Sequence, residues 1–145
     1  MPVSFRLFPS RNLILFRYAG HIRLTEPAAA VQASAQASGF RPAMRHLVDV
    51  SQVTGVDRDW PALLRQQAEI ATVMVPQGPE QLVLFYAPTR PGQWMAQMAR
   101  RSWEGLNIVS VRVIEDEAEA LALLGLPERT IAALLAAEPE PGPAA

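Results

Sequence analysis

The side chains best suited to nucleophilic or acid–base chemistry lie around one short stretch of the chain. Asp49 and Ser51 are two residues apart, and His46 stands at the start of the same predicted strand. A hydrolytic triad needs these three types within hydrogen-bond reach of one another. Alternation along a strand puts Asp49 and Ser51 on one face and His46 on the other. The sequence therefore predicts no catalytic residues and no enzymatic activity.

Residues that bind metals and cofactors are equally sparse. The chain has no cysteine, and its two histidines, His21 and His46, lack the short spacing of zinc ligands. No glycine-rich nucleotide motif occurs, and all 13 basic residues are arginine, so the lysine of a phosphate-binding loop is missing. An acidic cluster stands where a helix is predicted to begin, and the helix dipole favours acids there: Glu115, Asp116, Glu117 and Glu119. We therefore expect no metal and no cofactor.

A stripe of large apolar residues is the remaining candidate for a binding site. Trp94, Met95 and Met98 fall at helical spacing, and Trp103 follows them. Such a stripe is usually part of a core, because methionine is adaptable and tryptophan buries a large area. The same residues could line an apolar pocket for a small molecule. Both interpretations stay open at this point.

The elements that would position these residues follow from periodicity. Apolar runs or alternation predict strands at 3–7, 13–18, 45–50, 81–87 and 108–114. Five helices are predicted between the residues that begin and end them, which are mostly capping residues, prolines and glycines: Thr25 and Gly39, Asp59 and Pro76, Pro91 and Gly105, Asp116 and Gly125, and Pro127 and Ala137. The second of these helices has a predicted apolar stripe of Trp60, Leu63, Leu64, Ala68, Ala71 and Val75.

The order ββαβαβαβα, with one more helix at the end, predicts an α/β fold. Strands that alternate with helices form a mostly parallel sheet, and the short turn after the first strand adds an antiparallel pair. We expect a mixed sheet flanked by helices in one domain, residues 1–137. Residues 138–145 read as a flexible Pro-rich tail that buries nothing.

The composition narrows the function classes. Of 145 residues, 50% are hydrophobic and 19% charged, and the net charge is −1, so the chain as a whole does not attract nucleic acid. No apolar run approaches the ~20 residues that cross a bilayer, so we expect no membrane insertion and a cytoplasmic location. The short first strand leaves a sheet edge through which a homodimer could form.

Residues 47–60 carry a family resemblance. Asp49, Ser51, Val53 and Asp57 resemble, in type and spacing, the strand-to-helix junction of STAS domains, the SpoIIAA-like fold of anti-sigma-factor antagonists. Residues 111–124 resemble the last strand and helix of STAS-like domains, although the Phe and Trp common there are Ile114 and Leu123 here. The resemblance spans about residues 3–124 and implies a STAS-like fold.

One departure from the family pattern concerns regulation. In antagonist STAS domains a serine pair after the aspartate contains the phosphorylation site, and Arg58 and Asp59 occupy those positions here. Neither residue accepts a phosphate from a Ser/Thr kinase. Asp59 puts a fixed negative charge at a helix start, where it also serves as an ordinary cap.

The resemblance implies a non-enzymatic regulatory module that docks a protein partner. The loop expected to do so contains Ser51, Thr54, Asp57, Arg58 and Asp59. The alternative is a carrier of lipid or another small apolar ligand, because STAS-like folds resemble lipid-carrier domains of the CRAL-TRIO type. Trp94, Met95 and Met98 would then line its pocket.

Overall fold

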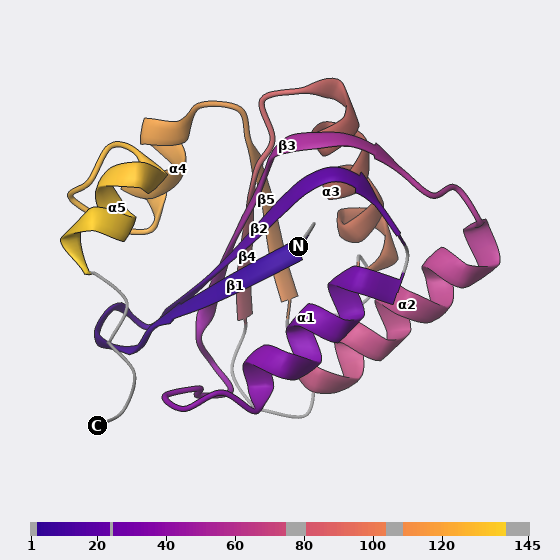
Figure 1. Cartoon of the computed structure of the whole chain (residues 1–145), viewed down its shortest axis with the longest axis horizontal. Coiled ribbons are helices and arrows are strands. Elements are labelled where there is room, and N and C mark those ends of the chain that lie inside the picture. The colour runs from indigo at the N-terminus through magenta and orange to yellow at the C-terminus, as the bar shows by residue number, and fades with distance from the viewer. Residues whose placement is uncertain (1–2, 24, 75–80, 104–108, 139–145) are drawn as a thin grey trace.

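A five-stranded sheet forms the centre of the molecule (Figure 1). The structure, a computed structural model, describes residues 3–23, 25–74, 81–103 and 109–138. The strands lie side by side in the order of the sequence: β1 (Val3–Phe8), β2 (Leu13–Ile22), β3 (Arg45–Val56), β4 (Gln81–Tyr86) and β5 (Val109–Ile114). β1 runs antiparallel to β2, and the other three pairs are parallel. The predicted fold class, a mixed and mostly parallel sheet, is confirmed.

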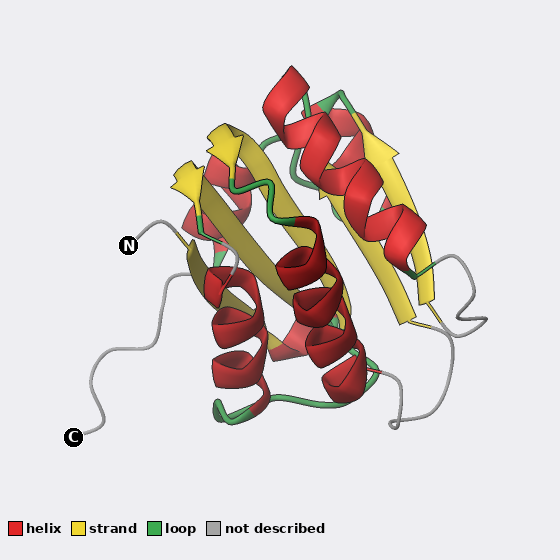
Figure 2. Ribbon diagram, turned by 90° about the vertical axis from the view of Figure 1, so that its right-hand side faces the viewer, coloured by secondary structure: helices red, strands yellow, loops and turns green. Residues whose placement is uncertain are grey.

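Three helices cover one face of this sheet and two shorter helices cover part of the other (Figures 1 and 2). The first group is α1 (Thr25–Ala35), α2 (Trp60–Met74) and α3 (Arg90–Ser102), and the second is α4 (Glu117–Leu123) and α5 (Ile131–Ala137). Each crossover from β2 to β5 moves one strand in the same direction. Right-handed crossovers therefore place α1, α2 and α3 on the same face. The helices that follow the last strand are left to cover the opposite face.

The apolar run of β2 is explained by burial on both faces of the sheet. Ile14 and Phe16 belong to the core beneath α1, α2 and α3, whereas Leu13 and Leu15 pack with the core of α4 and α5. All four side chains are at most 1% exposed. A strand with one wet face would alternate apolar and polar residues instead.

Arginines fasten the two C-terminal helices to the base of the sheet. Arg45 donates through Nη1 to the Leu124 carbonyl (2.6 Å) and through Nη2 to the Arg11 carbonyl (2.8 Å). Arg11 in turn pairs with Glu128 and, at 2.8 Å, with Glu138. The end of α5 at Ala137 agrees with the predicted last helix; residues 139–145 of the predicted tail lie outside the described residues.

Two predictions about the region around α2 are wrong. The strand predicted to end at residue 50 continues to Val56, so part of the expected docking loop is a strand. Leu64, expected in the apolar stripe of α2, is 57% exposed, and Ala68 is exposed too. Among the described side chains of α2, the buried ones are Leu63, Gln66 and Ile70, three and four residues apart, so Leu64 lies beside the buried face. The side chains of Trp60, Ala71 and Val75 lie outside the described residues.

Candidate docking surface

The carboxyl end of β3 is irregular, and this irregularity shapes the surface formed by the predicted docking residues. Arg17 and Ala19 of β2 pair with Asp49 and Gln52, so β3 has one extra residue between them. A second extra residue follows between Val53 and Gly55. Bulges of this kind bend a strand and change where its side chains point. They replace the strict alternation assumed from the sequence for residues 49–56.

Beyond Asp49, β3 pairs only with β2, because its pairing with β4 ends at Tyr86. The N-terminal turn of α3 packs against the freed side of β3. A Cβ atom on Gly92 would lie 2.7 Å from the carbonyl oxygen of Val50. Only glycine permits this approach, which brings α3 directly against the bulged end of β3.

Three residues of the predicted docking loop have specific partners. Asp57 Oδ1 lies 2.6 Å from Nε2 of His21, at the end of the neighbouring strand. Asp59 Oδ1 accepts a hydrogen bond from the Ala62 amide (3.2 Å), so Asp59 is the N-cap of α2. The guanidinium of Arg58 lies 4.8 Å from the centre of the Trp94 ring.

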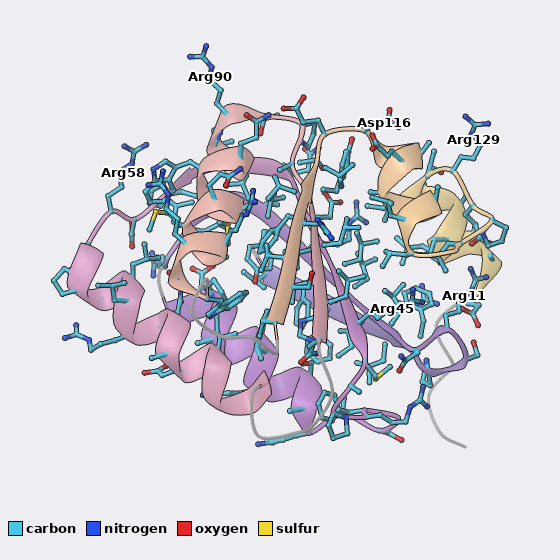
Figure 3. The ribbon with its side chains drawn as sticks, turned by 180° about the vertical axis from the view of Figure 1, so that it is seen from behind. Arg11, Arg45, Arg58, Arg90, Asp116 and Arg129 are labelled. Carbon is cyan, nitrogen blue, oxygen red and sulfur yellow. The ribbon has the colours of Figure 1, made fainter. Side chains whose placement is uncertain are left out.

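The two other predicted docking residues lie on β3 itself. The Ser51 amide donates to Asp49 Oδ1 (3.0 Å), and Thr54 is exposed near the strand's end. Arg58 and Asp59 are also exposed, so the segment presents polar groups of both signs to solvent. Figure 3 shows Arg58 and Arg90 reaching outward on the same side of the molecule.

A small pocket joins this segment to α3. Thr54, Gly55, Val56 and Arg58 line it from one side, and Arg90, Pro91 and Trp94 from the other, around a volume of about 270 Å³. Trp94 was predicted as a ligand-pocket residue, and Thr54 and Arg58 as partner-binding residues. The structure brings these separate candidates together on one surface.

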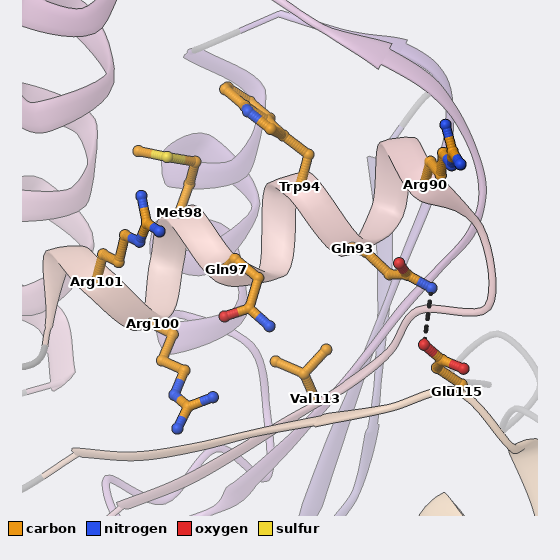
Figure 4. A pocket seen from close by; sticks show the side chains of 9 residues that line it. All are labelled: Arg90, Gln93, Trp94, Gln97, Met98, Arg100, Arg101, Val113 and Glu115. Carbon is orange, nitrogen blue, oxygen red and sulfur yellow. Dashed lines mark hydrogen bonds between the residues drawn. The ribbon is translucent and has the colours of Figure 1, made fainter.

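A larger hollow follows the outer side of α3 toward β5, with a volume of about 600 Å³ (Figure 4). Trp94 and Met98 line it, but Met95 does not and packs against the core instead. The remaining lining is mostly polar or charged: Arg90, Gln93, Gln97, Arg100, Arg101, Val113 and Glu115. Gln93 Nε2 donates to Glu115 Oε1 (3.1 Å) and thereby connects α3 to the end of β5.

Sequence reasoning assigned no binding role to the arginines of this hollow. Arg100 and Arg101 lie in the last turn of α3, where the helix dipole alone favours cations. Arg90 precedes Trp94 by one helical turn, and Arg101 follows Met98 by about one turn. This spacing is visible in the sequence, but it indicates a binding hollow only when β5 is known to lie beside α3.

Asp49, Ser51 and His46 do not form a catalytic group. His46 is 5% exposed and packs against the Phe16 ring, with ring centres 5.2 Å apart, on the face opposite Asp49. Burial lowers the pKa of the His46 imidazole to about 4. Asp49 instead accepts a hydrogen bond from Arg17 (3.3 Å). The three side chains are thus engaged separately.

The acidic cluster at residues 115–119 has structural partners. Asp116 Oδ2 accepts the Glu119 amide (2.8 Å) and caps α4, and Glu117 Oε2 accepts the Ile131 amide (2.8 Å) at the start of α5. Burial raises the pKa of the Tyr86 hydroxyl, and the nearby carboxylates of Glu117, Asp49 and Asp116 add to that effect. Over the described ranges, no three His, Asp or Glu side chains converge as metal ligands.

Comparison with solved structures identifies the fold. One similar structure is an uncharacterised protein of the DUF3478 family with a SpoIIAA-like fold from Shewanella loihica PV-4. It has a TM-score of 0.52 and 11% identity, over 84% of this chain and 91% of that one. The anti-sigma factor antagonist SpoIIAA in its unphosphorylated form has a TM-score of 0.50 and 9% identity, over 85% of this chain and 97% of that one. The chain has a SpoIIAA-like fold.

The STAS-like resemblance seen in the sequence is therefore confirmed at the level of the fold. No protein-family model matches the chain, and no curated protein sequence matches it either. Among the helices within the described ranges, none is long and apolar enough to span a membrane.

Proposed function

We propose that this chain is a non-enzymatic protein-interaction module that docks a partner at the carboxyl end of β3. The docking surface comprises Thr54, Asp57, Arg58 and Asp59, with Ser51 at its border and Trp94 at its centre. The observation that carries the proposal is the contact of Arg58 with the Trp94 ring, which joins the predicted loop to α3. Aromatic and arginine side chains dominate the energetics of many protein interfaces.

The polar partners of the segment support a preformed surface. Asp57 is held by His21, and Asp59 is held by the first turn of α2. A surface fixed in this way loses little conformational entropy when a partner binds.

The proposal includes constitutive binding in the cytoplasm. Arg58 and Asp59 have no hydroxyl group, so a kinase has no acceptor at the positions that carry the serine pair in antagonist STAS domains. The fixed charge of Asp59 is smaller than the ~−1.5 to −2 of a phosphoserine. Partner affinity would then depend on shape and permanent charge.

Site-directed photo-crosslinking tests the proposal. A photoreactive amino acid is placed at Thr54 of the full chain in its native host, and a matched one at Ala132, which is exposed on α5 across the sheet. A protein crosslinked from position 54 and not from position 132 is then purified. We expect it to bind the wild-type chain and to bind Trp94→Ala at least tenfold more weakly, with the melting temperature as a folding control.

Two outcomes contradict the proposal. One is that every protein crosslinked at position 54 fails to bind the purified wild-type chain. The other is ester or phosphate hydrolysis by the pure chain that Ser51→Ala abolishes, which would make it an enzyme.

A further inference from the structure

Three arginines lie along α3, and their surroundings contrast with those of several arginines of the sheet. Arg11, Arg17 and Arg45 each bond to a carboxylate or a carbonyl. Arg90, Arg100 and Arg101 are exposed and form no ion pair or hydrogen bond within the ranges that the structure describes. α3 itself contains no acidic residue. A chain of net charge −1 thus carries along one helix a basic strip of three arginines that have no ion-pair partner among the described residues.

The strip borders a real hollow. Arg90, Arg100 and Arg101 all line the 600 Å³ volume along α3, together with Trp94, Met98 and Val113. Arg90 lies at one end of the helix and the arginine pair at the other, with the apolar side chains between them (Figure 4). Ten residues of helix separate Arg90 from Arg100, or about 15 Å. An extended chain covers this length in about five residues.

These dimensions favour one kind of occupant. Carboxylates at both ends of a short segment would meet the two groups of arginines, and guanidinium groups bind carboxylates bidentately. An apolar residue in the middle would lie against Trp94 and Met98. Spacing over 15 Å suits a peptide better than a compact small anion, which needs donors that converge.

Nucleic acid fits this surface less well. Proteins that bind duplex DNA commonly neutralise about 6–10 phosphates. The hollow offers three arginines, with Arg58 nearby, and Glu115 lies in its lining. Three or four arginines are too few to neutralise that many phosphates.

We propose that the hollow along α3 binds a short acidic segment of a partner protein, with carboxylates about five residues apart flanking an apolar residue. This proposal rests on the proposed function and adds the chemistry of the partner. The hollow is continuous with the docking surface because Arg90 and Trp94 line both pockets. The partner would therefore contact the end of β3 and place its acidic segment along α3.

A random peptide library, displayed on phage and selected on the full chain, provides the first test. We expect enriched peptides to carry Asp or Glu on both sides of a large apolar residue. Selection on the variant Arg100→Gln/Arg101→Gln should lose this enrichment, whereas selection on Arg129→Gln should retain it. Arg129 is an exposed arginine on the far side of the molecule (Figure 3).

Fluorescence anisotropy with one enriched, labelled peptide provides the second test. We expect at least tenfold weaker binding by Arg100→Gln/Arg101→Gln, no change by Arg129→Gln, and weaker binding as salt rises. Circular dichroism checks that each variant remains folded. Glutamine keeps good helix propensity, so loss of binding would not reflect a lost helix.

Enrichment of peptides without acidic residues would overturn the inference. Tighter binding of single-stranded oligonucleotides, or of phosphatidylserine vesicles, that depends on the same two arginines would overturn it in favour of those ligands. The crosslinked partner separates this inference from the proposed function. If that partner loses affinity for Trp94→Ala but binds Arg100→Gln/Arg101→Gln normally, docking stands and the acidic-segment inference fails.

Discussion

His46 makes the stability of this fold depend on pH in a way that can be calculated. Gln81 Nε2 donates to the Met44 carbonyl (2.7 Å) and lies 3.0 Å from His46 Nε2. Since an amide nitrogen only donates, His46 Nε2 must accept, and its proton is on Nδ1. Protonating Nε2 would set two donors against each other inside the core. This agrees with the lowering of the His46 pKa to about 4 by burial.

The sign of the effect follows from proton uptake. An unfolded histidine binds its proton near pH 6.5, whereas the folded chain binds it only near pH 4. Between these values the unfolded state holds more protons, so stability falls as the pH falls from about 6.5 to 4. Between pH 7 and pH 5 the loss in the free energy of unfolding amounts to about 2 kcal/mol.

Urea unfolding at pH 7 and pH 5 measures this loss. His46→Gln is expected to be less stable than wild type at pH 7, because it loses packing against Phe16. Between pH 7 and pH 5, however, its free energy of unfolding should not show the additional loss of about 2 kcal/mol that His46 causes in wild type. His21→Gln, at a histidine whose side chain is 58% exposed, should retain that additional loss. An equal pH 7 to pH 5 difference in wild type and His46→Gln would refute the reasoning.

Four further changes test local features of the fold. Asp59→Ala should lower the free energy of unfolding by about 0.5–2 kcal/mol through loss of the α2 cap, and Asp59→Asn should restore most of it, as read from urea midpoints. Gly92→Ala should cost about 1–3 kcal/mol and lower the melting temperature, because its Cβ would press on the Val50 carbonyl. Removal of residues 139–145, which spares Glu138 and its pair with Arg11, should leave the melting temperature unchanged; a drop of several degrees would show that the tail docks. Mass spectrometry of the chain from its native host should find no phosphate on Ser51 or Thr54 that changes with growth state.

The features that the sequence predicts well are those fixed by neighbouring residues. Asp59 and Asp116 were expected to cap helices, and each accepts the amide three residues ahead. The buried strands were recognisable because β2, β3 and β4 are covered on both faces, which demands continuous apolar runs. Such signals need no knowledge of the rest of the fold.

The features that the sequence could not predict depend on pairing between distant strands. The bulges in β3 arise where Gln52 and Gly55 meet β2, so residues 51–56 looked like a loop until their partners were known. The hollow along α3 depends on where β5 lies, and Arg100 and Arg101 alone indicate only a helix end. Leu64 is exposed because tertiary packing turned α2 toward Leu63 and Ile70.

At the two positions where the resemblance to antagonist STAS domains places a serine pair, Arg58 and Asp59 have structural contacts of their own. Asp59 already gives its carboxylate to the α2 amide of Ala62, and Arg58 lies against the Trp94 ring. A serine at position 59 could cap the helix only while its hydroxyl was free, so phosphorylation would alter the cap and the surface together. Aspartate keeps the cap and the charge in one permanent state. The arginine beside it connects this cap to α3 through the Trp94 ring, which lines both the small pocket and the hollow along α3. If a partner binds both surfaces, Trp94 is the side chain that it contacts in each, so Trp94→Ala should weaken its binding more than a change to either surface alone.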